Sequence, residues 1–411
     1  MITQRSSIDT YDFVFAGGGL AGLSLAWQIA QSPLRNRSML IVDHDSSPIQ
    51  NSTFSYWSEG SNPFLQAVSY TWDQLSVFTK DGSSRSNLGS YRYHTIRGAD
   101  IYRLVSQELS ACPRVTSLRG HISEMSETVE GVRILVDGRE YTGKWVFDSR
   151  PRSNTGQSQT EKYLRLKMSF QGWDIETDQD VFNPRNAILM DFRTYQGSDM
   201  CFFYVLPYDE RHALVEYTIF AQKPLSHSDS EAALYCYLES VFGLSAGQNF
   251  QLNHREAGCL LVTDQPFERR TGFRTLAIGL SGGRLKPSTG YAFTRIQRDS
   301  RAILRSLLQH NHPFHIPGDS PLYTLLDSLM LEVMRDYPEN TQRIFSALFE
   351  RNSMDNVLRF LDEDAPLSEV LRLMATLPAG LFIKIMGQRS LKPGLSKALN
   401  FGSSYSQGNR S

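Results

Sequence analysis

Three glycines near the start of the chain have the spacing of a dinucleotide-binding loop. Residues 11–27, YDFVFAGGGLAGLSLAW, read as an apolar strand, a glycine loop and the beginning of a helix. Gly17, Gly19 and Gly22 occupy the glycine positions of G-x-G-x-x-G, and Asp43 follows about twenty residues later, at the end of a second apolar run. This pattern predicts that a pyrophosphate meets the helix N-terminus and that Asp43 accepts a hydrogen bond from a ribose hydroxyl.

Each position in the glycine loop has its own physical task. Gly17 allows the tight turn, Gly19 lets the backbone approach the pyrophosphate, and Gly22 lets helix and strand pack closely. Leu20 and Ala21 begin the helix, where free N–H groups and the positive end of the helix dipole face the phosphates. The alternative is an ordinary strand–helix turn that binds no ligand.

A second glycine-bearing segment lies far along the chain. Residues 275–283, TLAIGLSGG, again form an apolar run that ends in glycines before a helix. An inserted sheet followed by such a return strand favours FAD over NAD, because a nicotinamide dehydrogenase more often has a contiguous six-stranded sheet. Gly279, Gly282 and Gly283 are expected near the flavin. The alternative is a glycine turn that caps the next helix.

The elements that position these loops form an α/β fold with a Rossmann-like cofactor domain and an inserted antiparallel sheet. Residues 1–160 are predicted to form the first part of the FAD-binding domain, and several strand-like segments in 161–274 to form the substrate domain. Residues 275–310 return to the cofactor domain and 311–400 are largely helical. The polar residues 401–411 are predicted to be a disordered tail.

Composition excludes several classes of protein. The net charge of −1 gives no overall field that favours nucleic acid, and the 4 cysteines are widely spaced, which argues against a disulfide framework or a zinc site. No metal site is predicted, and no apolar run reaches the length of a membrane-spanning helix. We therefore expect a cytoplasmic protein, either soluble or peripherally bound to a membrane.

Several motifs together resemble the lycopene cyclase family. They are GGGLAGLSLA, FDSRP (147–151), QGW (171–173), LVEYT (214–218) and GGRLKPSTGYAFTRI (282–296), in the order in which the family has them. The resemblance implies β-cyclisation, in which a ψ end of lycopene or a related linear carotenoid closes to a β-ionone ring. It also implies FAD in its reduced form, supplied by NAD(P)H, with no net electron transfer to the product.

Glu216 is the catalytic residue that the resemblance implies. The family has an acidic motif of the type E-[E/D]-T on a strand facing the flavin, and here Glu216, Tyr217 and Thr218 occupy it. A carboxyl in an apolar pocket has a raised pKa and can act as a general acid. Either Glu216 or the flavin delivers the proton. The alternative is a solvent-facing Glu216 beside Thr218, since both lie on one face of an alternating strand.

Other positions carry a functional and a structural interpretation side by side. Tyr56 and Trp57, in an aromatic segment expected to be a lining loop, match a family position near the substrate, where aromatic faces stabilise cations. Core packing is the alternative for both, and it is favoured for Trp173. Arg103 lies on a predicted helix where related flavoproteins contact the cofactor, although a solvated helix face is an equal alternative.

The C-terminal region suggests how an insoluble substrate is delivered. Residues 374–386, MATLPAGLFIKIM, are apolar, broken by proline, and lie in a basic part of the chain. We expect this region to contact a membrane surface, the alternative being a helix packed on the body. Alternative functions are an FAD-dependent monooxygenase, a cyclase for another polyprenyl substrate, and a non-catalytic carotenoid or prenyl carrier.

Overall fold

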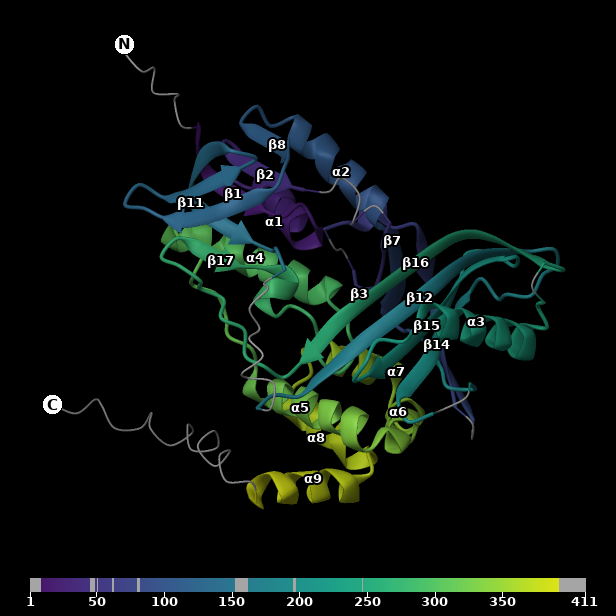
Figure 1. Ribbon diagram of the computed structural model, residues 1–411. Helices are drawn as coiled ribbons and strands as arrows, with labels where there is room; N and C mark the ends of the chain where they lie inside the picture. The colour runs from purple at the N-terminus through teal and green to yellow at the C-terminus, as the bar shows by residue number, and fades with distance from the viewer. Residues whose placement is uncertain are drawn as a thin grey trace, which may run out of the picture.

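The computed structural model describes residues 9–44, 49, 51–60, 63–79, 82–151, 162–194, 197–245 and 247–391. The predicted tail at 401–411 and most of the turn-rich segment between the first two predicted regions lie outside the described residues. Figure 1 shows one end of the molecule formed by the N-terminal sheet, a second sheet of long strands in the middle, and the C-terminal helices at the opposite end.

The first sheet is a twisted, mainly parallel sheet with both faces buried. Its strand order is β8-β2-β1-β11-β10-β9, and β17 pairs with β11. Residues alternate along the first strand, so that Phe13 and Phe15 pack toward the helices while Val14 packs on the opposite face. The strands are β1 (Asp9–Ala16), β2 (Met39–Asp43), β8 (Val115–Arg119), β9 (Ile122–Glu127), β10 (Val132–Val136), β11 (Arg139–Asp148) and β17 (Thr275–Ala277).

Three helices cover one face of this sheet. They are α1 (Leu20–Ala30), α2 (Gly98–Ser110) and α4 (Phe293–His310), and all three contribute to one apolar core with β1 and β2. The predicted return of the chain is confirmed, because β17 lies parallel to β11 with Ala277 opposite Asp148. A short 3-10 helix, η3 (Gly279–Gly282), then leads toward α4.

A small antiparallel sheet connects the two larger ones. It has the order β3-β7-β4, formed by β3 (Thr53–Glu59), β4 (Tyr70–Trp72) and β7 (Tyr91–Arg97), with the 3-10 helix η1 (Leu65–Ala67) between. The expectation of an aromatic loop after β2 was therefore wrong. Aromatic and β-branched side chains favour strands, and β3 pairs residue by residue with β7.

The second sheet has the order β16-β12-β15-β14-β13-β5-β6, and its pairs are antiparallel except β13 with β5. It takes two strands from the N-terminal part of the chain, β5 (Gln74–Phe78) and β6 (Ser83–Asn87). The other strands are β12 (Arg165–Thr177), β13 (Asn186–Asp191), β14 (Met200–Pro207), β15 (His212–Ala221) and β16 (Phe250–Thr263). The helix α3 (His227–Phe242) packs on one face of this sheet.

The opposite face of the second sheet is covered by the C-terminal helices (Figure 1). These are α5 (Pro321–Asp336), η4 (Pro338–Asn340), α6 (Thr341–Glu350), α7 (Met354–Leu361), α8 (Leu367–Thr376) and α9 (Ala379–Leu391). Within the described ranges no single helix has the length and apolar composition to cross a bilayer. The pair formed by α8 and α9, bent by 107°, meets both criteria together.

Candidate active site

The glycine loop follows β1 directly, and its backbone shows why glycine is needed there. Gly17 has a φ of +113°, a conformation that L side chains rarely adopt. A Cβ on Gly22 would lie 2.2 Å from the carbonyl oxygen of Gly17, so the helix can approach the turn only without a side chain. A Cβ on Gly19 would meet nothing within 4 Å. The turn and the close packing are thus confirmed, and the space beside Gly19 is open.

A cavity lies beside Gly17 at the carboxyl ends of the parallel strands. The cavity has a volume of about 620 Å³ and includes Gly17, Asp43, Asp148 and Arg150 in its lining. Asp148 and Arg150 form an ion pair, with Nε of Arg150 2.9 Å from Oδ1 of Asp148. Ligands bind open α/β sheets at this edge, and the bare backbone beside Gly19 fits a pyrophosphate.

The late glycine segment lies against the glycine loop. Gly279 has a φ of +62°, and a Cβ there would lie 2.8 Å from the Cβ of Ala21 in the first turn of α1. The hydroxyl of Ser281 donates to the carbonyl of Ser149, which is 3.3 Å away. Gly282 and Gly283 instead form the turn that closes η3. Of the late glycines, Gly279 is therefore the one that packs on the start of α1.

Arg103 is placed at the surface of α2. Its side chain is 75 % exposed, and its guanidinium lies 2.6 Å from the carboxylate of Asp100, one turn earlier. This position agrees with the alternative in which Arg103 lies on a solvated helix face.

Glu216 lies on β15 in the middle of the second sheet, between Gly172 on β12 and Tyr204 on β14. It is partly buried, and the hydroxyl of Thr218 donates to its Oε1 over 3.0 Å. Burial and, to a smaller extent, the negative charge of Glu256 raise the pKa of Glu216 to about 8. The solvent-facing alternative does not describe this position, because the side chain is partly buried, and a carboxyl with this pKa is largely protonated at neutral pH.

Glu256 is a residue that the sequence did not single out. It lies on β16 opposite Gly172, so the two glutamates flank the same glycine across three neighbouring strands. Recognising this pair requires the register of both neighbours of β12, and the alternation of polar and apolar residues does not reveal register between distant segments.

Successive side chains of β3 point to opposite faces, and this separates Tyr56 from Trp57. Trp57 packs with Tyr93 and lies 4.9 Å from Tyr291, ring centre to ring centre, on the side of Glu216. Its neighbour Tyr56 points the other way and stacks on Phe293, with ring centres 4.2 Å apart, in the core of the first sheet.

Trp173 lies on the sheet face opposite to Glu216. It is fully buried in the core beneath α3, in edge contact with Tyr235 at 4.7 Å between ring centres. Its register partner on β15 is Val215, whereas the partner of Glu216 is Gly172. The core-packing interpretation that was favoured for Trp173 describes this position.

Three tyrosines form a hydrogen-bonded group above Glu216. The hydroxyl of Tyr93 is bonded to that of Tyr204 and lies 3.2 Å from that of Tyr291. Burial raises the pKa of all three phenols well above the usual value, so all three are neutral. The negative charge of Glu216 raises the pKa of Tyr204 and Tyr291 as well, which places both phenols near the carboxyl.

The segment 282–296 holds Tyr291 in place and connects it to the C-terminal helices. The backbone N–H of Lys286 donates to the carbonyl of Tyr291 over 2.8 Å. The buried ammonium of Lys286 lies 3.0 Å from Asp327 on α5 and 2.9 Å from Glu363 after α7. A buried cation that pairs with carboxylates from two elements holds these elements in a fixed arrangement, because losing both partners would leave a buried charge uncompensated.

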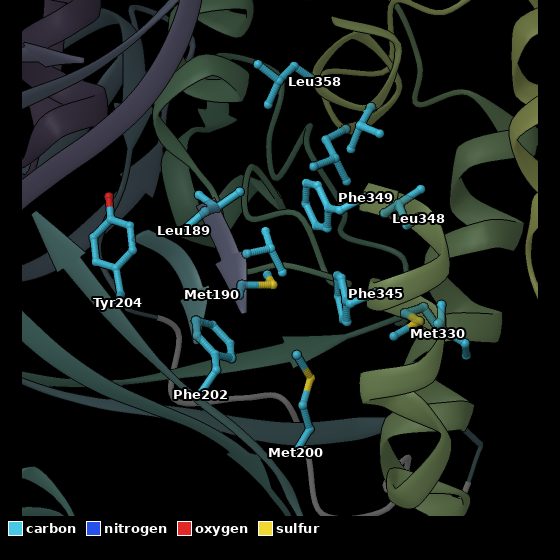
Figure 2. Close-up of a cluster of buried hydrophobic side chains, with 14 of the residues drawn as sticks. Leu189, Met190, Met200, Phe202, Tyr204, Met330, Phe345, Leu348, Phe349 and Leu358 are labelled. Carbon is cyan, nitrogen blue, oxygen red and sulfur yellow. The ribbon is translucent and has the colours of Figure 1, made fainter. Parts of the chain in front are cut away.

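The same sheet face continues from Tyr204 into a large apolar cluster. Figure 2 shows Met200 and Phe202 of β14 and Met190 of β13 facing Phe345 and other side chains of the C-terminal helices. Phe202 lies opposite Thr218, and Met200 lies opposite Phe220, so the cluster and Glu216 share one face. These side chains are buried, and methionines adapt their shape to neighbouring apolar groups, so the cluster closes this sheet face against the C-terminal helices.

Metal-ligating side chains do not gather at this site. His310, His312 and His315 lie close together, with ring centres of His310 and His315 4.2 Å apart. Across the described part of the chain, no group of three or more His, Cys, Asp or Glu side chains is arranged to hold a metal ion.

Comparison with solved structures identifies the fold. A geranylgeranyl bacteriochlorophyll reductase-like protein from Thermoplasma acidophilum matches with a TM-score of 0.57 and 13% identity over 92% of this chain and 99% of that one. p-Nitrophenol 4-monooxygenase from Pseudomonas putida DLL-E4 matches with a TM-score of 0.61 and 11% identity over 87% and 98%. The halogenase PltM in complex with phloroglucinol and FAD gives 0.52 and 13% over 85% and 78%. The predicted Rossmann-like, flavoprotein-type fold is confirmed.

Sequence comparison identifies the family. A lycopene beta-cyclase from Pseudescherichia vulneris is 26% identical over 298 residues, which are 68% of this chain and 70% of the relative. The chloroplastic lycopene beta cyclase of Arabidopsis thaliana is 21% identical over 81% of this chain and 66% of its own length, and that of Solanum lycopersicum is 20% identical over 73% and 60%. The plant relatives are thus matched over less than two thirds of their length. The family model for lycopene cyclase protein matches residues 12–384, and the chain belongs to the lycopene cyclase family.

Proposed function

We propose that this protein is a lycopene β-cyclase, an isomerase that closes the ψ ends of lycopene to β-ionone rings, giving γ-carotene and then β-carotene. The observation that carries the proposal is Glu216, a carboxyl with a pKa of about 8 on an apolar sheet face in a member of this family. A general acid works best when its pKa lies near the working pH.

The proposed reaction begins when the substrate gains one proton and ends when it loses another. The carboxyl of Glu216 gives its proton to the terminal trisubstituted alkene, which leaves a carboxylate and a tertiary carbocation. A neighbouring double bond attacks the cation and closes the ring. Loss of a ring proton to a base then restores a neutral product, so the overall change is an isomerisation.

The aromatic side chains beside Glu216 are suited to the cationic stage. Tyr204 and Tyr291 lie near the carboxyl, and Tyr93 and Trp57 contact Tyr291. The negative faces of such rings attract a cation. Their hydroxyls are neutral because burial raises their pKa, so they solvate the cation without capturing it as phenolate nucleophiles.

FAD is the cofactor for which the glycine loop is built. Gly17 and Gly19 would approach the pyrophosphate, Asp43 would accept from the ribose, and Gly279 would lie beside the bound group. Reduced by NAD(P)H, the flavin would supply a negative charge that favours the protonated form of Glu216 and the carbocation, with no net redox change.

Delivery of the substrate is proposed to occur from a membrane surface. Leu367 and Leu371 on α8 are 59% and 60% exposed, and Ile383 and Met386 on α9 are 69% and 50% exposed. These side chains belong to the bent helix pair that has the length and composition of a membrane segment. An apolar patch of this kind is typical of a protein that rests on lipid.

One experiment tests this proposal. Purified holoprotein is incubated with lycopene-loaded liposomes, FAD and NADPH in heavy water without oxygen. We expect a bicyclic product with one solvent deuterium per ring, NADPH consumption far below product formation, and protein that co-floats with the liposomes. A requirement for oxygen would indicate the monooxygenase, and unchanged lycopene with bound flavin the carrier. Protein that remains in the aqueous fraction contradicts the membrane contact alone.

A further inference from the structure

Two glutamates face each other across a glycine in the second sheet. In the register of β16, β12 and β15, Glu256, Gly172 and Glu216 lie side by side. A Cβ on Gly172 would lie 3.0 Å from Cγ of Glu256 and 3.1 Å from Cδ1 of Leu214. Glycine therefore leaves the space between the carboxyls clear, where any larger residue would fill it.

We propose that Glu256 is a positioning residue for the proton of Glu216: its carboxylate, anchored by Thr53 and facing Glu216 across Gly172, keeps Glu216 protonated. The role rests on the proposed function, because it matters only if Glu216 is the acid. The pairing itself is a property of the protein that can be measured without the reaction.

The hydrogen bonds to the two carboxyls are unequal. Thr53, at the start of β3, bonds to Glu256 through both its hydroxyl and its backbone, and both bonds lower the pKa of Glu256. Glu216 receives the single hydroxyl of Thr218. Hydrogen bonds to a carboxylate favour its charged form. The pair therefore loses its first proton from Glu256 and its second from Glu216.

One neighbouring charge, that of Asp174, opposes this order, and the phenols nearby carry no charge. Asp174, next to Gly172 on the same face of β12, raises the pKa of Glu256, although its own carboxylate is bonded to His212 over 2.5 Å and lies 3.8 Å from Arg97. The phenols of Tyr204 on β14 and of Tyr291 in the loop before α4 face Glu216, and the phenol of Tyr208, directly after β14, faces Glu256 and Asp174. Burial raises the pKa of all three phenols and leaves them neutral.

The sign of the pH effect follows from the proposed role. Glu216 can donate only while it is protonated, so activity should fall as the pH rises through its pKa of about 8. The charge on Glu256 raises that pKa. Glu256→Gln removes this charge. The alkaline limb of the pH profile of kcat should therefore move to lower pH by about one unit, the size expected from a neighbouring like charge.

The test combines two measurements on flavin-loaded protein. The first is the pH profile of kcat, and the second is infrared titration of the protonated carboxyl band. Glu176→Gln is the matched control. Glu176 lies on β12 four positions after Gly172, on the same sheet face, and its side chain is exposed. We expect Glu216 and Glu256 to lose their protons in two separate steps in the parent; in Glu256→Gln the lower of these steps should be absent and the upper one should move to lower pH. Burial also raises the pKa of Asp362 to about 7, so a step from Asp362 should appear in the parent and the variant alike.

A second variant keeps the inference testable if Glu256→Gln folds poorly. Thr53→Val removes one hydrogen bond to Glu256. It should raise the pH of the lower titration step, which belongs to Glu256, while the upper step, which belongs to Glu216, stays at the same pH. The inference is overturned if the alkaline limb of the kcat profile is unchanged in Glu256→Gln. It is also overturned if Thr53→Val shifts neither titration step. If infrared titration shows the pair but no cyclisation occurs, the proposed function fails and the pairing stands.

Discussion

The glycine loop after β1 and the carboxyl on β15 solve different physical problems. The loop is made of backbone: a positive φ at Gly17, close packing at Gly22 and open space at Gly19. None of these features carries a charge that titrates. The Glu216 region consists of side chains from several strands, and its central property is a pKa that burial shifts into the working range. Binding and proton transfer are thus separated, so each can be altered without the other.

The largest effect should come from Glu216→Gln. The amide keeps the shape and can still accept from Thr218, but it has no proton to donate. General acids contribute about 10²- to 10⁴-fold to rate, so kcat should fall by about that factor. Flavin affinity should remain at the parental value, because Glu216 belongs to the second sheet. Full activity would show that the proton comes from elsewhere, and Glu176→Gln again serves as control.

Two substitutions in the glycine loop should have intermediate effects that differ in kind. An alanine at Gly22 gains about 1 kcal/mol of helix propensity, but its Cβ would lie 2.2 Å from the backbone oxygen of Gly17. Overpacking of this kind costs about 1–3 kcal/mol, so the melting temperature of the flavin-free protein and its flavin affinity should both decrease.

Gly19→Ala provides the contrasting case. Gly19 has a φ of −75° and an open side, so alanine should leave the melting temperature of the flavin-free protein unchanged. The methyl group would occupy the space expected for the pyrophosphate, and flavin binding should weaken about tenfold or more. If Gly19→Ala binds flavin normally, the open space beside Gly19 does not serve the cofactor.

The smallest effect is expected at Arg103. Its side chain is mostly exposed and pairs with Asp100 at the surface, and exposed ion pairs contribute little. Arg103→Ala should change flavin Kd by less than about threefold, measured by flavin fluorescence. A large loss would return Arg103 to the cofactor site and extend that site onto α2.

The two regions also differ in how far the sequence predicts them. The glycine loop is local: the tasks of Gly17 and Gly22 depend on neighbours a few residues away, so spacing alone locates them. Glu216 was identified through a family motif, whereas Glu256 was missed, because its place beside Gly172 depends on the register of β12 with two distant strands. Register also places Trp173 on the face opposite to Glu216, in agreement with the core packing that was favoured for it. The segment at β3 was misread because its aromatic residues suit a strand as well as a loop.

The position of β5 and β6 in the sequence affects how the chain folds. They precede β11 in sequence, yet β5 completes the second sheet by pairing in parallel with β13. A fragment that begins at β12 would expose the edge of β13, and exposed edges invite aggregation. Pairing of such distant segments slows folding, because a long loop must close before the contact forms. The cofactor-binding part and the carboxyl-bearing sheet are therefore expected to unfold together, and neither can be produced by cutting the chain between them.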